Sequence, residues 1–211
     1  MKAKKSKNRI LTLFGSGETS PHMAKNYRHI IDGLSHDLQK NLLLDTPFGF
    51  QENNMILSKK IQDYFASKIN LKLKSLNLTS EESYSNEHTT LLSNADFIFS
   101  GPGSPTYASK IWLKHNLGDV LKNKLKSGVV MAFASAAALT LGRYVIPVYE
   151  IYKVGDLQGL NEGLNVLDFL GKDTVIVPHF NNQEGGDHDT SHCFIGKKRF
   201  NNLIYGLDVM T

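Results

Sequence analysis

Short apolar runs alternate with amphipathic stretches along the chain. The apolar runs are typical of buried strands, and apolar residues three or four positions apart are typical of helices. We expect strands at residues 9–14, 41–45, 70–78, 95–101, 128–134 and 173–180. We expect helices at residues 21–31, 53–69, 81–92, 105–115, 117–126 and 197–204. The regular alternation predicts an α/β fold with a mostly parallel sheet.

Four turns that follow predicted strands carry small or polar residues. They read GSGETS at 15–20, SGPGSP at 100–105, FASAAA at 133–138 and PHFNN at 178–182. Open α/β sheets bind their ligands at the carboxyl ends of the strands. We therefore expect the functional site where these four turns meet.

The composition favours one globular domain at residues 9–211. The chain has 211 residues, of which 41% are hydrophobic and 21% are charged, as in ordinary soluble domains. Much of the net charge of +4 comes from lysines in residues 1–8, which we expect to form a flexible basic tail. The chain has no nucleic-acid-binding motif and no apolar run long enough to span a bilayer. We therefore expect it to bind neither nucleic acid nor a membrane. The single cysteine, Cys193, favours a cytoplasmic location.

Ser135 lies in the stretch AFASAAALTLG at 132–142, between a predicted buried strand and a predicted helix. This is the place of the serine in a nucleophile elbow, the sharp strand-to-helix turn of many hydrolases. The flanking residues depart from G-x-S-x-G, so Ser135 has two interpretations. It is either a nucleophile or a small residue in a tightly packed core. His179 ends another predicted strand, and we expect it to meet Ser135 as the catalytic base.

The glycine-rich turns suggest further parts of such a site. An oxyanion hole needs backbone N–H groups that point to one spot, and we expect them from Ala136 and from Gly103 in GPGSP. The GSGETSP turn resembles a phosphate cradle, but it lacks the P-loop lysine and the dinucleotide spacing. No nucleotide cofactor is therefore expected.

The polar segment from 179 to 193 has two alternative interpretations. His188 and His192 are four positions apart, as in a helical metal site, but Gly185 and Gly186 mark a loop and no H-E-x-x-H occurs. We therefore expect a loop that faces the substrate and binds no metal. The residues expected to contact substrate are Ser104, Asn181, Asn182 and Asp187.

Four phrases carry a family resemblance: FSGPGSPTY, FASAAALTLG, VPHFNNQEGG and YGLDVMT. In this order they resemble the serine peptidase family of alpha-aspartyl dipeptidase (peptidase E) and cyanophycinase, from residue 11 to the end. The phrases PVYEIYKVG and EGGDHDTSHCFIGKKR are most similar to an uncharacterised bacterial branch described as type 1 glutamine amidotransferase-like. The resemblance implies a three-layer sandwich like that of class I glutamine amidotransferases (flavodoxin-like), with a nucleophile elbow.

The resemblance also implies roles for single residues. Ser135 matches the family nucleophile and His179 the base, and Gly101 and Gly103 match the turn that helps to form the oxyanion hole. It implies hydrolysis of peptide bonds beside acidic residues without a metal or organic cofactor. The expected partners are small peptides, or acidic or amide small molecules, and a second copy of the chain in a homodimer.

The sequence departs from the family pattern at three positions. The elbow glycines are replaced by Phe133 and Ala137, and Val209 stands where the family has the triad glutamate. Because valine cannot orient a histidine, another acid is required for a complete triad. Glu150 and Asp208 are the two alternatives.

Three functional hypotheses follow. The first is a serine hydrolase that acts as a peptidase through Ser135. The second is a catalytically degenerate relative that binds a small acidic or amide ligand, which the loss of the acid at Val209 favours. The third is an amidotransferase-like amidase, which is weakened because the only cysteine, Cys193, lies outside the elbow.

Overall fold

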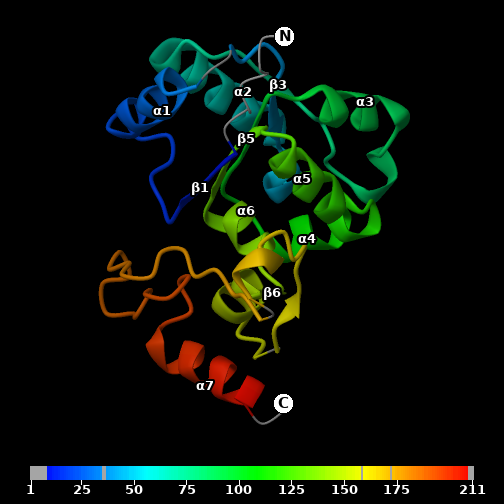
Figure 1. Ribbon diagram of the computed structural model, residues 1–211. Coiled ribbons are helices and arrows are strands. Elements are labelled where there is room, and N and C mark those ends of the chain that lie inside the picture. Colours follow the sequence, from blue (N-terminus) through cyan, green and yellow to red (C-terminus); the bar gives the residue numbers. More distant parts are fainter. Residues whose placement is uncertain (1–8, 35–36, 158, 172, 209–211) are drawn as a thin grey trace.

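The main sheet of the protein contains five parallel strands. The computed structural model describes residues 9–34, 37–157, 159–171 and 173–208. The sheet has the order β1-β5-β4-β2-β3. Its strands are β1 (Ile10–Phe14), β2 (Asn41–Leu44), β3 (Leu73–Ser75), β4 (Phe97–Ser100) and β5 (Val130–Ala134). Because all five run in the same direction, their carboxyl ends meet at one edge (Figure 1).

Helices cover both faces of this sheet. One face packs against α1 (Met23–Asp32), α2 (Asn54–Tyr64) and the π-helical turn η2 (Phe65–Ile69). The other packs against α3 (Asn86–Asn94), α4 (Pro105–Lys114), α5 (Leu117–Lys126) and α6 (Ser135–Thr140). Successive strand residues point to opposite faces, so the whole of β5 is buried between two hydrophobic clusters. These layers confirm the predicted α/β fold with a mostly parallel sheet.

A third hydrophobic cluster lies outside the main sheet. It includes Leu139 from α6, Ile151 from the π-helical turn η4 (Glu150–Val154), and Cys193. A small antiparallel pair, β6 (Tyr144–Val145) and β7 (Asn161–Glu162), contributes Val145 to it. Short helices η1 (Thr46–Phe48) and η5 (Asp168–Leu170) complete the connections. In Figure 1 the chain after β7 runs beyond the sheet and ends in α7 (Lys197–Asp208).

The prediction of a strand at 173–180 is wrong. This segment forms a single bridge between Val175 and Tyr144 and takes two N–H hydrogen bonds at Thr174 O, from Arg143 and Tyr144. It therefore runs beside β6. Among the described residues, its one backbone hydrogen bond to the turn after β1 is donated by His179 N–H to Gly15 O at 3.3 Å. A ladder with β1 would need several such bonds, so within the described residues β1 stays an edge strand.

Several other predicted elements differ in length from those observed. The strand expected at 70–78 is reduced to β3 (Leu73–Ser75), since a left-handed turn at Asn77 (φ +58°) follows it. The helix expected at 81–92 divides into the 3₁₀ turn η3 (Glu81–Ser83) and α3. The short helix expected at 197–204 continues to Asp208 in α7. None of the described helices is long and apolar enough to cross a membrane.

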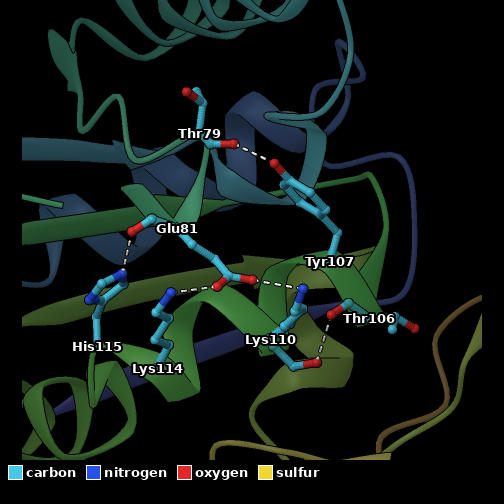
Figure 2. Close-up of polar contacts among 8 residues, drawn as sticks. Thr79, Glu81, Thr106, Tyr107, Lys110, Lys114 and His115 are labelled. Carbon is cyan, nitrogen blue, oxygen red and sulfur yellow. Dashed lines mark hydrogen bonds and ion pairs between the residues drawn. The ribbon is translucent and has the colours of Figure 1, made fainter. Parts of the chain in front are cut away.

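Glu81 joins the η3 turn to α4. Its carboxylate pairs with Lys110 at 2.8 Å and with Lys114 at 2.6 Å, one helical turn apart on α4 (Figure 2). These two cations lower the pKa of Glu81 from 4.5 to about 2. Tyr107 of the same helix donates its hydroxyl to Thr79 O at 2.6 Å. These contacts fix the segment before α3 against α4, the helix that begins beside the GPGSP turn.

Candidate active site

Ser135 occupies a strained strand-to-helix turn. It follows the last residue of β5 and is the first residue of α6. Its φ is +49°, in the left-handed region that residues with a β-carbon rarely adopt. Such strain persists only where the surroundings enforce it, and it is the backbone conformation of a nucleophile elbow. The elbow presents the Ser135 hydroxyl to a pocket at the carboxyl edge of the sheet.

His179 reaches the same pocket from the segment after Pro178. Its Nε2 lies 2.9 Å from Ser135 Oγ, so the two side chains form a hydrogen bond. Like Ser135, His179 has a left-handed backbone, with φ +50°. The Phe194 ring lies 4.8 Å from the imidazole ring between centroids. Cys193 bonds twice to Pro178 O, through its N–H at 3.1 Å and its Sγ at 3.2 Å.

The electrostatic surroundings keep His179 suited to accept a proton. Burial lowers the pKa of the imidazole below its usual 6.5, and the charge of Glu184 acts in the opposite direction. The ring is therefore neutral near pH 7, and Nε2 is free to act as a base. Within the described part of the chain, His179 Nδ1 has no hydrogen-bond partner.

The structure does not bring the first candidate acid to His179. Glu150 lies in η4, and its Oε2 accepts a hydrogen bond from Thr106 Oγ1 at 3.1 Å instead. Asp208 is the last residue of α7, and its side chain is outside the described part of the structure, as is Val209. The acid of a triad therefore stays a prediction.

Two of the three residues expected at the oxyanion hole line the pocket. Ala136 and Gly103 do so. Gly101 is not among the lining residues, and its carbonyl accepts the Ala137 N–H at 3.2 Å. Gly103 has φ +144°, and a β-carbon there would be 2.0 Å from Pro47 O. Only glycine fits this turn without moving the backbone.

The residues expected to contact substrate divide into two groups. Asn182 lines the pocket and donates its Nδ2 to Thr190 Oγ1 at 3.0 Å. Asn181 and Asp187 are exposed and are not among the residues that line it. Ser104 is buried and caps α4, where its Oγ accepts the Tyr107 N–H at 3.1 Å. Ser104 therefore stabilises the start of α4 and does not line the pocket.

The two altered elbow positions have different surroundings. Phe133 is fully buried and packs edge-on against Trp112, with ring centroids 6.4 Å apart. Its side chain belongs to the core below α4 and is not among the pocket residues. Ala137 lies in α6 and is absent from the described residues with positive φ, so its β-carbon causes no strain.

The pocket around Ser135 has a volume of about 400 Å³. It is lined by Ser16, Gly17, Glu18, Thr19, Pro102, Gly103, Pro105, Ser135, Ala136, Leu139, Val148, Tyr149, Pro178, His179, Asn182, Glu184, Cys193 and Phe194. Turns after β1, β4 and β5 and the segment after Pro178 all contribute to this lining. The four turns singled out in the sequence therefore do meet around one cavity.

Sequence reasoning missed two acidic residues of this pocket. Glu18 comes from the GSGETS turn and is only 7% exposed, and burial raises the pKa of its carboxyl. Glu184 comes from the loop after His179 and is exposed. An acidic residue in the turn after the first strand was the available signal for Glu18, since side chains there face the carboxyl edge.

Two residues of the polar segment from 179 to 193 make other contacts. Asp189 accepts hydrogen bonds from Ser191 and from the N–H of Lys197 at the start of α7. His192 packs between Phe180 and Phe200, with centroids 4.3 and 4.8 Å away. Among the residues that the structure describes, no three His, Cys, Asp or Glu side chains are grouped as metal ligands.

Solved structures show the same fold at low sequence identity. A peptidase from an acI-B1 Actinobacterium is 22% identical, with a TM-score of 0.65, over 83% of this chain and 71% of that one. A protein described as a candidate peptidase E from Listeria monocytogenes EGD-e is 17% identical, with a TM-score of 0.63, over 93% of this chain and 87% of that one. At these identities the likeness concerns the fold alone. No curated protein matches the sequence.

The sequence model named Peptidase family S51 matches residues 11–208, which include Ser135, His179 and both glycine-rich turns. The match covers nearly the whole described chain and agrees with the resemblance found in its motifs. The chain belongs to peptidase family S51 and is a serine-type peptidase by that membership.

Proposed function

We propose that the protein hydrolyses peptide bonds through an acyl-enzyme on Ser135. The Ser135 Oγ attacks the peptide carbonyl carbon while its proton passes to His179 Nε2. The tetrahedral intermediate then expels the amine, which takes the proton back from His179, and an ester remains on Ser135. Water, deprotonated by His179, attacks this ester, and Ser135 leaves with the proton as the carboxylic acid is released.

The observation that carries the proposal is the 2.9 Å contact between Ser135 Oγ and His179 Nε2. It joins a strained serine on an elbow to a neutral imidazole, the two groups that nucleophilic catalysis requires. Ala136 and Gly103 border the same cavity. Their N–H groups are the proposed donors to the oxyanion.

The proposed reaction depends on a histidine that tertiary contacts orient. Phe194 packs on the His179 ring, and the His179 N–H donates to Gly15 O. In hydrolases with a Ser-His-acid triad, disabling the acid lowers kcat by about 10⁴-fold. If no acid bonds to Nδ1, turnover should therefore be slow, and labelling of the serine is a more sensitive assay than substrate cleavage.

The preference for acidic residues stays a prediction of the resemblance. A cationic side chain is the usual partner of a substrate carboxylate. Among the described residues that line the pocket, none is lysine or arginine. The substrate of the proposed reaction is therefore defined here only as a peptide bond.

A second candidate function is ligand binding without catalysis. It is favoured by the unpartnered Nδ1 of His179 in the described part of the chain. Such a protein would keep the pocket but lack an activated serine. The amidase alternative gains no support, because Cys193 is buried and bonded to Pro178 O.

Fluorophosphonate labelling of the purified protein tests the proposal. We expect wild type to be labelled at one residue, and labelling to disappear in Ser135→Ala and to fall at least about 100-fold in His179→Ala. Ser16→Ala is the matched control, since Ser16 lines the same pocket but the hydroxyl that bonds to His179 Nε2 is that of Ser135. Absence of labelling in folded wild type would overturn the proposal in favour of the binding protein.

A further inference from the structure

Glu18 is a buried carboxylate with no counter-charge among the residues that the structure describes. It is 7% exposed and has no hydrogen bond or ion pair with any other residue that the structure describes. Within the described ranges, its own backbone N–H is the only group that stabilises the charged form. The effect of burial outweighs this hydrogen bond and raises the pKa of the carboxyl. Buried carboxylates are normally paired or bonded. An unpaired one that faces a cavity indicates that its partner comes from outside the chain.

The position of Glu18 connects it to the proposed chemistry. It lines the pocket that contains Ser135 and His179. A β-carbon on Gly101 would lie 3.7 Å from Glu18 Oε1, which places this carboxylate beside the turn of the proposed oxyanion hole. Negative charge at that point would oppose an oxyanion. A bound cation would remove this opposition at the moment when the substrate is in place.

The second acidic residue of the described pocket lining reinforces the negative potential. Glu184 is the second charged residue of the described lining, and neither lysine nor arginine accompanies the two. Lys60 borders a neighbouring hollow of about 330 Å³, which Glu18 also lines. It is exposed and makes no ion pair with Glu18. The cavity therefore favours a cationic ligand over an anionic one.

We propose that Glu18 binds a positively charged nitrogen group of the peptide substrate, either its α-ammonium or a basic side chain. The inference rests on the proposed peptidase function. Glu81 shows the opposite situation in the same protein, because two lysines satisfy it permanently and lower its pKa. At Glu18 the substrate takes the place of those lysines. A cation there forms charge-assisted hydrogen bonds, which are the strong ones in a buried site.

Binding of dipeptides to the inactive Ser135→Ala protein tests this role. Calorimetry with lysyl-alanine, norleucyl-alanine and N-acetyl-lysyl-alanine separates the two cationic groups, since norleucine lacks the side-chain charge and acetylation removes the α-ammonium. We expect Glu18→Gln, added to Ser135→Ala, to weaken the best of these ligands about tenfold or more. Dependence on the lysine side chain or on the free amine then identifies the group bound.

Two matched variants control for general charge effects. Glu184→Gln removes the same charge from the same pocket at an exposed position, and we expect a smaller loss of affinity. Lys60→Met should leave the affinity unchanged, because Lys60 makes no ion pair with Glu18. Thermal unfolding of Glu18→Gln should occur at the same or a higher temperature, because an uncompensated buried charge is removed. This separates lost recognition from lost folding.

The inference is overturned if Glu18→Gln changes all three affinities by less than about twofold. It is also overturned if none of the peptides binds. Fluorophosphonate labelling of wild type is measured in parallel, because it reports the activated serine without any cationic group. Labelled protein with no effect of Glu18→Gln rejects the inference alone, whereas unlabelled protein rejects the proposed function.

Discussion

The nucleophile and the base of the proposed dyad come from two very different regions. The elbow region, residues 130–140, consists of a strand and a helix whose side chains are almost all buried. The base segment, residues 178–196, forms no strand or helix in the described structure. Its backbone is left-handed at four non-glycine residues, His179, His192, Cys193 and Phe194, whereas Ser135 is the single such residue of the elbow region.

This difference shows how stability and function are distributed between the regions. Regular, buried segments take their stability from packing, and local changes there reduce the stability of the whole domain. A segment with several left-handed residues depends on a few tertiary contacts, which offset its strain. We therefore expect substitutions in the elbow region, other than at Ser135 itself, to act first on folding, and those in the base segment to act first on catalysis.

The largest effect is expected from Phe133→Ala in the elbow region. Phe133 is fully buried against Trp112, and deleting such a ring leaves a cavity that costs about 3–5 kcal/mol. Phe180→Ala is the matched change in the base segment, where Phe180 is 57% exposed. It should lower the free energy of unfolding by less than about 1 kcal/mol. Urea denaturation measures this free energy for both variants. Equal costs would contradict the distinction between the regions.

Phe194→Ala should separate activity from stability. The Phe194 ring packs 4.8 Å from His179 and is half-buried. Its loss should misplace the imidazole and so lower the rate of fluorophosphonate labelling about ten- to hundredfold. The free energy of unfolding should change by less than about 2 kcal/mol. Phe194→Leu should restore part of the rate. An unchanged labelling rate in Phe194→Ala would show that Phe194 does not position the base.

Cys193 reports whether the base segment opens before the whole domain unfolds. Its thiol is buried, and burial raises its pKa, so native protein at pH 8 should react slowly with iodoacetamide. In subdenaturing guanidinium, we expect Cys193 to be alkylated about tenfold faster than it would be if its thiol reacted only in the globally unfolded protein. The reason is that strained segments open locally. Alkylation that follows global unfolding at every concentration would contradict this, and would make the two regions one cooperative unit.

The sequence predicted the elbow region much better than the base segment. The apolar run before Ser135 and the small residues after it determine a buried strand and a tight helix by local pattern alone. The apolar run at 173–177 suggested another strand, but its partner is set by contacts with Tyr144 that no local pattern reveals. The charge of Glu18 was visible in the sequence, but its burial follows from long-range packing.

Glu184→Gln should change the pH dependence of the dyad. Burial lowers the pKa of His179 and Glu184 raises it, so removal of the Glu184 charge lowers this pKa further. The base is active when neutral, so the acidic limb of the labelling profile should move to lower pH, with little change in the plateau. Glu162→Gln, on β7, is the control and should leave the profile in place. An acidic limb that moves to higher pH would contradict the effect of Glu184 on the pKa of His179.

The smallest effect is expected from Glu81→Gln, outside both regions. Lys110 and Lys114 lower the pKa of Glu81 from 4.5 to about 2, so its contribution to stability is present above pH 4.5 and is lost as the pH falls through about 2. At pH 6 the variant should unfold less than about 3 °C below wild type, since its partners are exposed. This difference should shrink in 1 M salt and at pH 2. Fluorophosphonate labelling and Cys193 alkylation should not change, because Glu81 contacts neither the elbow region nor the base segment; a change in either rate would mean that α4 transmits the loss of its ion pairs to the pocket.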